Sequence, residues 1–219
     1  MSSTRPQRCG VLLAGGANVR FGGRPKGLEP LGAIRMADHV LVALDAVCDE
    51  VVVGANADDA AQWFPGRRIV RDPAPGLGAL GALESALHAS HASTIVVCAW
   101  DMPCVTTGVL EALATVVDNG ASCALPRHDD GRLEPLCAAY ASRLAPEVTQ
   151  MLDAGFRAAH AIFDEHQGVA LAVSALVPHG NGSRIFFNVN TPAQLAQAAR
   201  WLAPLGELPH TGPTDRRFA

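Results

Sequence analysis

The sequence predicts a three-layer α/β domain with a mainly parallel central sheet. Short and almost uninterrupted apolar runs recur along the chain, and segments with helical spacing of aliphatic residues lie between them. Apolar runs without polar alternation are typical of strands that are buried on both faces. The alternation of such runs with helical segments indicates a sheet covered by helices on each side.

The expected elements follow this alternation in order. Strands are predicted at residues 11–14, 51–55, 68–70, 94–99, 122–126 and 136–140. Helices are predicted at residues 36–48, 80–90, 109–119, 144–152 and 158–166. A last helix begins at NTPAQL, where Thr191 suits the N-cap, Pro192 the first helical position and Gln194 the closing position of a capping box. We expect residues 1–203 to form a single domain and residues 204–219, rich in proline and glycine, to form a flexible tail.

Composition excludes several classes of partner. The formal net charge is −4, so no general basic character favours nucleic acid or an anionic membrane, and a polyanionic ligand must be met by local positive charge. The six cysteines are scattered without a CxxC pair, which favours core thiols in a reducing compartment. The N-terminal residues lack an apolar signal region, and no apolar run reaches the ~18 residues of a membrane span. These observations predict a cytoplasmic protein.

The stretch LLAGGANVRFGGRPKG, residues 12–27, is the strongest candidate for a ligand-binding loop. Its glycines come directly after the first expected strand, at the edge where open α/β sheets bind ligands, and they allow backbone N–H groups to approach a phosphate. Arg20 and Lys26 add positive charge. The spacing matches neither the dinucleotide pattern GxGxxG nor the P-loop, which ends in GK[ST]. A glycine-rich surface turn with solvated cations is the structural alternative.

Two aspartates follow expected strands and are candidates for the same edge of the sheet. Asp101 comes just after the strand at residues 94–99, and Mg²⁺ prefers one or two carboxylates together with phosphate oxygens, so Asp101 is our candidate metal ligand. Asp72 follows the strand at residues 68–70 and precedes a glycine-rich stretch. Either aspartate alone would also fit a simple turn.

Asn188 and Asn190, in FFNVNTPAQL, lie just before the last helix. Their amides could bind a metal-bound water or a phosphate, or they could serve as local caps of that helix.

Several of these motifs together resemble one family. LAGGANVRFGGRPKG is similar to the signature LAGGxxxRxGGxxK of nucleotidyltransferases of the molybdenum cofactor guanylyltransferase type, and the NVNTP and EPLCAAY segments also resemble that family. The resemblance spans residues 11–202. It implies a Rossmann-like nucleotidyltransferase fold, and a nucleotide site made of Leu13, Ala14, Gly15, Gly16, Lys26, Asn56, Asp72, Gly81 and Asp101.

The activity that the resemblance implies is transfer of GMP from GTP to the terminal phosphate of molybdopterin, with release of pyrophosphate and with Mg²⁺ as cofactor. Arg20, Lys26 and Asp101 are its expected catalytic residues. GTP and molybdopterin are the implied partners, with transient contacts to proteins that mature molybdoenzymes. The acceptor phosphate could meet one of the cations of the second half, which are Arg127, His128, Arg132, Arg157 and Arg184.

The sequence also departs from the family pattern. Pro25 replaces a common Asp, Gly54 stands where Asn is frequent, Ala79 where proline is usual, and Glu134 where Gln or His is usual. The stretch PKGLEPLG, residues 25–32, is closer to sugar-phosphate nucleotidyltransferases. A CTP-dependent or sugar-phosphate enzyme therefore stays an alternative, as does a non-catalytic nucleotide-binding protein of the same fold.

Overall fold

A computed structural model of the chain describes residues 7–15, 23, 25–72, 74, 76–180 and 182–202. Its centre is a seven-stranded sheet with the strand order β5-β4-β1-β6-β8-β7-β9. The strands of this sheet are β1 (Arg8–Leu13), β4 (Glu50–Gly54), β5 (Ile69–Val70), β6 (Thr94–Ala99), β7 (Cys123–Arg127), β8 (Cys137–Ala141) and β9 (Val169–Ala172). Among these strands β8 alone runs antiparallel to its neighbours, β6 and β7, so the predicted mainly parallel sheet is confirmed.

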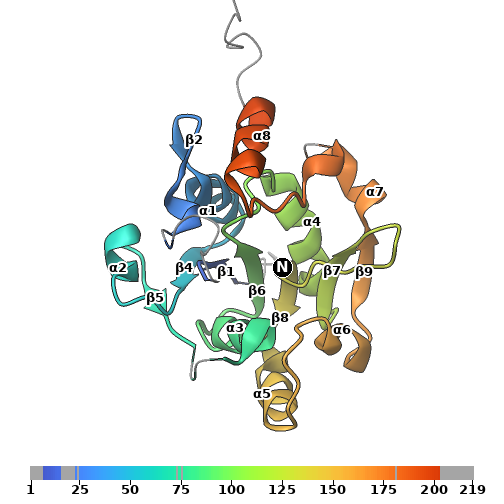
Figure 1. Ribbon diagram of the computed structural model, residues 1–219. Helices are drawn as coiled ribbons and strands as arrows, with labels where there is room; N and C mark the ends of the chain where they lie inside the picture. The colour runs from blue at the N-terminus through green and yellow to red at the C-terminus, as the bar shows by residue number, and fades with distance from the viewer. Residues whose placement is uncertain are drawn as a thin grey trace, which may run out of the picture.

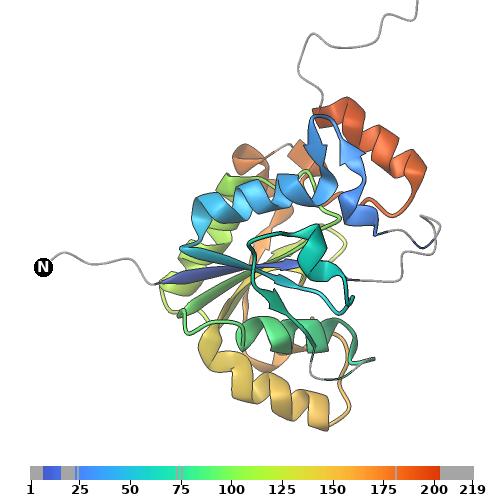
Figure 2. The same ribbon diagram turned by 90° about the vertical axis from the view of Figure 1, so that its left-hand side faces the viewer.

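Helices cover both faces of the sheet, with α1 and α4 on one face and α3 and α5 on the other (Figure 1). Figure 2 shows the same three layers from the side, with α1 above the sheet and α3 and α5 below it. The helices are α1 (Met36–Val47), α2 (Ala60–Trp63), α3 (Gly78–Leu87), α4 (Thr107–Asp118), α5 (Ala145–Asp153), α6 (Ala161–Glu165), α7 (Val173–Leu176) and α8 (Pro192–Leu202). The 3₁₀ turns are η2 (Lys26–Leu28), η3 (Ser142–Leu144), η4 (Val177–His179) and η5 (Gly182–Arg184).

Apolar side chains along one strand pack alternately into the two layers. In β6, Val96 and Cys98 belong to the cluster under α1 and α4. Ile95 and Val97 belong to the cluster under α3 and α5. Successive side chains of a strand point to opposite faces, so an uninterrupted apolar run is what a sheet buried on both sides requires. This arrangement confirms the predicted three-layer α/β fold.

Every predicted strand and helix has a counterpart whose ends agree within three residues. The largest shift among the strands is at β1, which starts at Arg8 instead of residue 11. The Arg8 side chain is buried, and its guanidinium group donates to Asp118 Oδ2 from Nε at 2.9 Å and to Glu111 Oε2 from Nη1 at 2.6 Å. A charged residue thus extends the strand because two carboxylates of α4 hold it.

The short helices α2 and α7, an edge strand and a small hairpin were not predicted. The edge strand β9 pairs with β7, and two of its four side chains are exposed. Its apolar run VALA continues without a break into VSAL of α7, so apolar periodicity does not separate this strand from a helix. A small hairpin of β2 (Pro30–Leu31) and β3 (Ile34–Arg35) packs beside α8, where Leu31, Met36, Val189 and Ala198 form a third apolar cluster. Figure 2 shows this hairpin and α8 next to each other at one end of the sheet.

The start of α8 follows the predicted cap. The Gln194 N–H donates to Thr191 Oγ1 at 3.2 Å, and Pro192 is the first helical residue. The Gln194 side chain reaches one residue further back than a capping box requires, because its Oε1 accepts from the Asn190 N–H at 2.8 Å. The cap therefore also fixes the backbone of Asn190.

All six cysteines are free, and five of them are buried, as the core interpretation predicted. Burial raises the pKa of Cys9 to about 12 and that of Cys123 to about 11. Within the described part of the chain, no helix has the length and apolar character that a bilayer span needs.

Gly27 and Trp100 form a close contact that links the loop after β1 to the end of β6. Trp100 is 1% exposed and its ring stacks on Trp63 with centroids 6.0 Å apart. A Cβ atom on Gly27 would lie 2.1 Å from Trp100 Cε3. The chain can pass over the indole ring at this point only because residue 27 has no side chain.

We expect Gly27→Ala to destabilise the protein by about 1–3 kcal/mol, because either the ring or the loop must move to accept the methyl group. Urea unfolding followed by circular dichroism measures this loss. Gly15→Ala is the control, since a Cβ at Gly15 would meet no atom of the described residues within 4 Å. Equal stability of the two variants would show that the contact is not a tight one.

Candidate functional site

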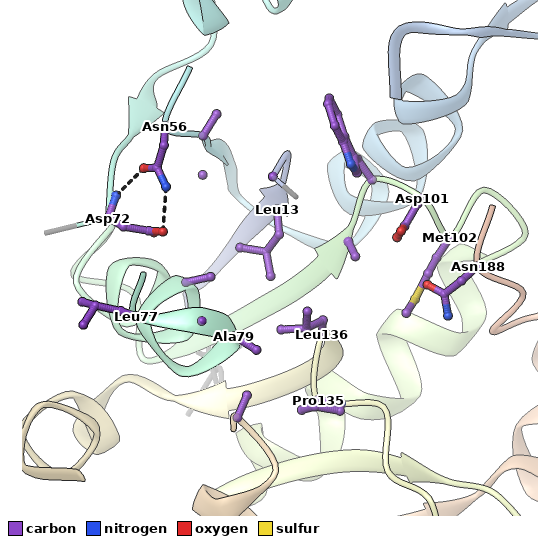
Figure 3. Close-up of a pocket in the computed structure, with 18 of the residues that line it drawn as sticks. Leu13, Asn56, Asp72, Leu77, Ala79, Asp101, Met102, Pro135, Leu136 and Asn188 are labelled. Carbon is purple, nitrogen blue, oxygen red and sulfur yellow. Dashed lines mark hydrogen bonds between the residues drawn. The ribbon is translucent and has the colours of Figure 1, made fainter. Parts of the chain in front are cut away.

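A pocket of about 670 Å³ lies across the carboxyl ends of β1, β4 and β6 (Figure 3). The sequence predicted a ligand-binding loop at this same edge of the sheet. Its lining combines polar side chains with small apolar ones. The lining residues are Leu13, Gly15, Lys26, Gly54, Ala55, Asn56, Asp72, Gly76, Leu77, Gly78, Ala79, Ala82, Ala99, Trp100, Asp101, Met102, Glu134, Pro135, Leu136, Ala158, Ala159, His160 and Asn188.

Two of the lining residues, Lys26 and Asp101, form an ion pair. Lys26 Nζ donates to Asp101 Oδ2 at 2.5 Å and to Asn190 Oδ1 at 2.7 Å. The Lys26 and Asp101 side chains are only 12% and 14% exposed. Asp101 Oδ1 is buried, and none of the residues that the structure describes forms a hydrogen bond with it. An unpaired buried carboxylate oxygen is costly, so this atom is an acceptor or ligand position ready for another group.

Three backbone segments position this ion pair. Lys26 begins the 3₁₀ turn η2, and Asp101 comes two residues after the end of β6. The Val189 N–H donates to the Asp101 carbonyl at 2.8 Å, which brings the segment before α8 alongside the end of β6. Because Gln194 holds the Asn190 backbone, the Asn190 amide is directed at the ammonium group of Lys26.

Asn56 and Asp72 form a second polar pair on the β4 and β5 side of the pocket. Asn56 Nδ2 donates to Asp72 Oδ2 at 2.8 Å, and the Asp72 N–H donates to Asn56 Oδ1 at 2.8 Å (Figure 3). Ser85 Oγ, from α3, donates to the other Asp72 oxygen at 3.0 Å. The reciprocal bonds hold both side chains in one orientation at the pocket wall.

The start of α3 forms the wall next to this pair. Gly76 and Gly78 line the pocket with φ angles of 81° and 65°, which favour glycine. Gly81, the glycine that the resemblance implied, does not line the pocket: it is buried within α3 and packs against Leu77. Ala14 is also buried behind the lining residues, and its N–H donates to the Gly54 carbonyl at 2.8 Å.

The other expected residues have different positions. Asn188 lines the pocket close to Met102 (Figure 3). Asn190 reaches it through Lys26. Gly16 and Arg20 lie outside the described residues.

The five cations considered for the acceptor are not pocket-lining residues. His128 Nε2 and Arg132 Nη1 both contact Glu134 Oε1, the histidine at 2.8 Å. Arg157 Nη1 donates to the carbonyl groups of Leu152 and Phe156. The Arg184 guanidinium group lies 4.7 Å above the Trp201 ring. Arg127, at the end of β7, is exposed.

Trp100 and Glu134 are among the lining residues that the sequence did not identify as functional candidates. Trp100 is buried beside Asp101, and none of the described residues forms a hydrogen bond with its Nε1. Glu134 is 5% exposed and carries the contacts of His128 and Arg132. The available signal for Glu134 was its departure from the family pattern, since Glu stands where the resembling family usually has Gln or His.

Comparisons with known proteins identify the family of this chain. The family description "MobA-like NTP transferase domain" matches residues 10–171. A molybdenum cofactor guanylyltransferase of Shewanella frigidimarina is 29% identical over 90% of this chain and 98% of its own length. A Mycobacterium tuberculosis protein with the printed name "Probable molybdenum cofactor guanylyltransferase" is 34% identical over 85% of this chain and 90% of its own.

A solved structure is also similar. The molybdopterin-guanine dinucleotide biosynthesis protein A of Archaeoglobus fulgidus superposes with a TM-score of 0.74 at 27% identity, over 89% of this chain and 97% of that one. Residues 10–171, which match the family description, contain Lys26, Asn56, Asp72 and Asp101, four of the polar residues that line the pocket. The chain belongs to the MobA-like NTP transferase domain family, and it is a nucleotidyltransferase.

Proposed function

We propose that this protein transfers GMP from GTP to the terminal phosphate of molybdopterin, forming the guanine dinucleotide cofactor and releasing pyrophosphate. The largely buried Lys26 and Asp101 pair is the observation that carries the proposal, because it brings a cation and a carboxylate oxygen, Asp101 Oδ1, to which no described residue donates, to the lining of the pocket. Family membership and the names of the relatives support the same reaction. The six free cysteines suit the cytoplasmic location that belongs to this proposal.

The nucleotide occupies the β4 and β5 side of the pocket in this proposal. Leu13 and Gly15 line the pocket at the end of β1, next to Asn56 and Asp72. The fixed amide and carboxylate present acceptors and donors for a base edge or a ribose hydroxyl group. Gly16 and Arg20 continue the same loop and are proposed to contact the phosphates.

The residues around Asp101 fit a divalent cation such as Mg²⁺. The described residues contain no cluster of three or more His, Cys, Asp or Glu side chains for a metal. Mg²⁺ does not need one, because it is typically held by one or two carboxylates, phosphate oxygens and water. Asp101 would hold it through the oxygen that has no other partner, with the amides of Asn188 and Asn190 nearby for metal-bound water. The ion would offset negative charge on the phosphates.

The protein's own contribution to the transfer is positioning and charge. A phosphate acceptor is already ionised near neutral pH, so its attack on the α-phosphorus needs no general base, and nucleotidyl transfer depends mainly on alignment of the two anions. Lys26 lines the pocket, and Asp101 and Asn190 hold its ammonium group. It therefore brings a positive charge to the place where the acceptor and the triphosphate meet.

Asp101→Asn should lower GMP transfer by about 100-fold or more, because the amide keeps the shape and the hydrogen bond to Lys26 but loses the charge that holds the cation and fixes the ammonium group. Pyrophosphate release with GTP, Mg²⁺ and molybdopterin measures the effect. Asp58→Asn is the matched control, since the Asp58 side chain is 98% exposed and lies outside the pocket. Equal rates for the wild type and Asp101→Asn would remove Asp101 from the mechanism.

The choice of base is tested by thermal shift with GTP and CTP in the presence of Mg²⁺. We expect GTP to raise the Tm more than CTP, since a ligand stabilises the folded state in proportion to the logarithm of its concentration over its Kd. Asn56→Ala should weaken GTP binding about 10-fold through the loss of the fixed amide. Asn119→Ala, an exposed site at the end of α4, serves as the control. Stabilisation by CTP alone would assign the enzyme to the CTP-dependent reaction instead.

A further inference from the structure

The two ends of the pocket belong to different parts of the sheet. Asn56 follows β4 and Asp101 follows β6, whereas Glu134 precedes β8, the next strand beyond β6. Neighbouring strands lie about 4.8 Å apart, so the β4 end and the β8 end of the pocket are on the order of 14 Å apart. With Asp101 between them, the nucleotide side and the acceptor side of the proposed reaction have separate walls.

Glu134 is the buried acidic side chain of the β8 end. Its backbone is fixed twice, because its N–H donates to the Pro126 carbonyl and its carbonyl accepts from the Cys137 N–H, both at 3.1 Å. The carboxylate is fixed as well, since His128 Nε2 and Arg132 Nη1 both contact Oε1. The His128 ring in turn lies edge-on to Phe186, with centroids 5.8 Å apart.

The second oxygen of Glu134 has a different environment. None of the residues that the structure describes forms a hydrogen bond with Glu134 Oε2. Oε2 is also not among the fully buried polar atoms that lack a partner. Glu134 itself lines the pocket. Oε2 is therefore the atom with which this carboxylate can meet a ligand.

We propose that Glu134 reads the pterin ring of the acceptor by accepting a hydrogen bond from its 2-amino-4-oxo-pyrimidine edge. This inference rests on the proposed function for the identity of the acceptor. The edge carries neighbouring N–H donors, which a carboxylate that can only accept matches. Pro135 and Leu136, which follow Glu134 along the same wall, offer flat apolar surface to a planar ring (Figure 3).

The contacts of Glu134 distinguish a carboxylate from an amide at this position. Arg132 has donors only, so a Gln at position 134 must turn its carbonyl oxygen toward Arg132 and His128. Its NH₂ group would then face the pocket. Glu134→Gln thus changes the pocket-facing atom from an acceptor into a donor, while the contacts behind it are kept.

The experiment compares two ligands that differ in one group. Titration calorimetry in the presence of GTP and Mg²⁺ measures the Kd of 6-hydroxymethylpterin and of the corresponding lumazine, which has a 2-oxo group in place of the 2-amino group. We expect the wild type to bind the pterin about 10- to 100-fold more tightly, the usual range for a hydrogen bond to a charged group. In Glu134→Gln this preference should fall to about two-fold or less.

Asp129→Asn is the matched control, because it removes the same charge from an exposed position of the same loop and should leave the preference unchanged. The Kd of GTP should be the same in all three proteins. A preference that survives in Glu134→Gln overturns the proposal, and so does a wild type that binds neither pteridine. An equal loss of GTP affinity in Glu134→Gln also overturns it, since Glu134 would then read guanine.

GMP transfer to molybdopterin by the wild type is measured separately. Transfer by the wild type together with an unchanged ligand preference in Glu134→Gln would remove only the assignment of Glu134. Absence of transfer with a Glu134-dependent pterin preference would remove only the transfer reaction.

Discussion

Three segments that are far apart in the chain meet at the ammonium group of Lys26. Its two acceptors, Asp101 and Asn190, lie 75 and 164 residues further along the chain. A nearly buried ion pair stabilises a protein only if its geometry is well fixed, so the surrounding segments must hold Lys26 and Asp101 in one arrangement. Gly27 has to pass closely over Trp100, and the cap of α8 has to hold Asn190 in place. The hairpin and α8 pack together at the same end of the sheet and hold these segments in place.

Six of the seven strands of the central sheet and the helices that cover it could be predicted from the sequence, and so could the position of the ion pair's members at one edge of the sheet. In a parallel sheet the carboxyl ends of strands meet, so the residues that follow the apolar runs at residues 51–55, 68–70 and 94–99 must lie together. The contact between Gly27 and Trp100 and the strand β9 could not be predicted in this way. Both depend on pairing between distant segments and leave no periodic pattern in the sequence.

The burial of Glu134 in the site could not be predicted from the sequence either. The sequence placed it in a segment similar to one of the family, but a glutamate before a proline carries no local sign of burial. Its role depends on Arg132 and His128, which fold back over it in the turn between β7 and β8. Two of the five cations that the sequence offered to an acceptor phosphate are therefore engaged with the carboxylate of Glu134, and Glu134 is the residue of this group that lines the pocket.

The direction of β8 has a consequence for how such an enzyme can change. Because β8 runs antiparallel to β6 and β7, it begins at the edge of the sheet where these two strands end. The residues just before β8, in the single turn that connects β7 to β8, therefore lie at the edge with the pocket. The walls on the β4 and β5 side come from other connections of the chain. Insertions or substitutions in that single turn can therefore give a descendant a new acceptor while the inherited nucleotide-handling parts are untouched. Divergence of acceptor choice within one scaffold needs only a local genetic change.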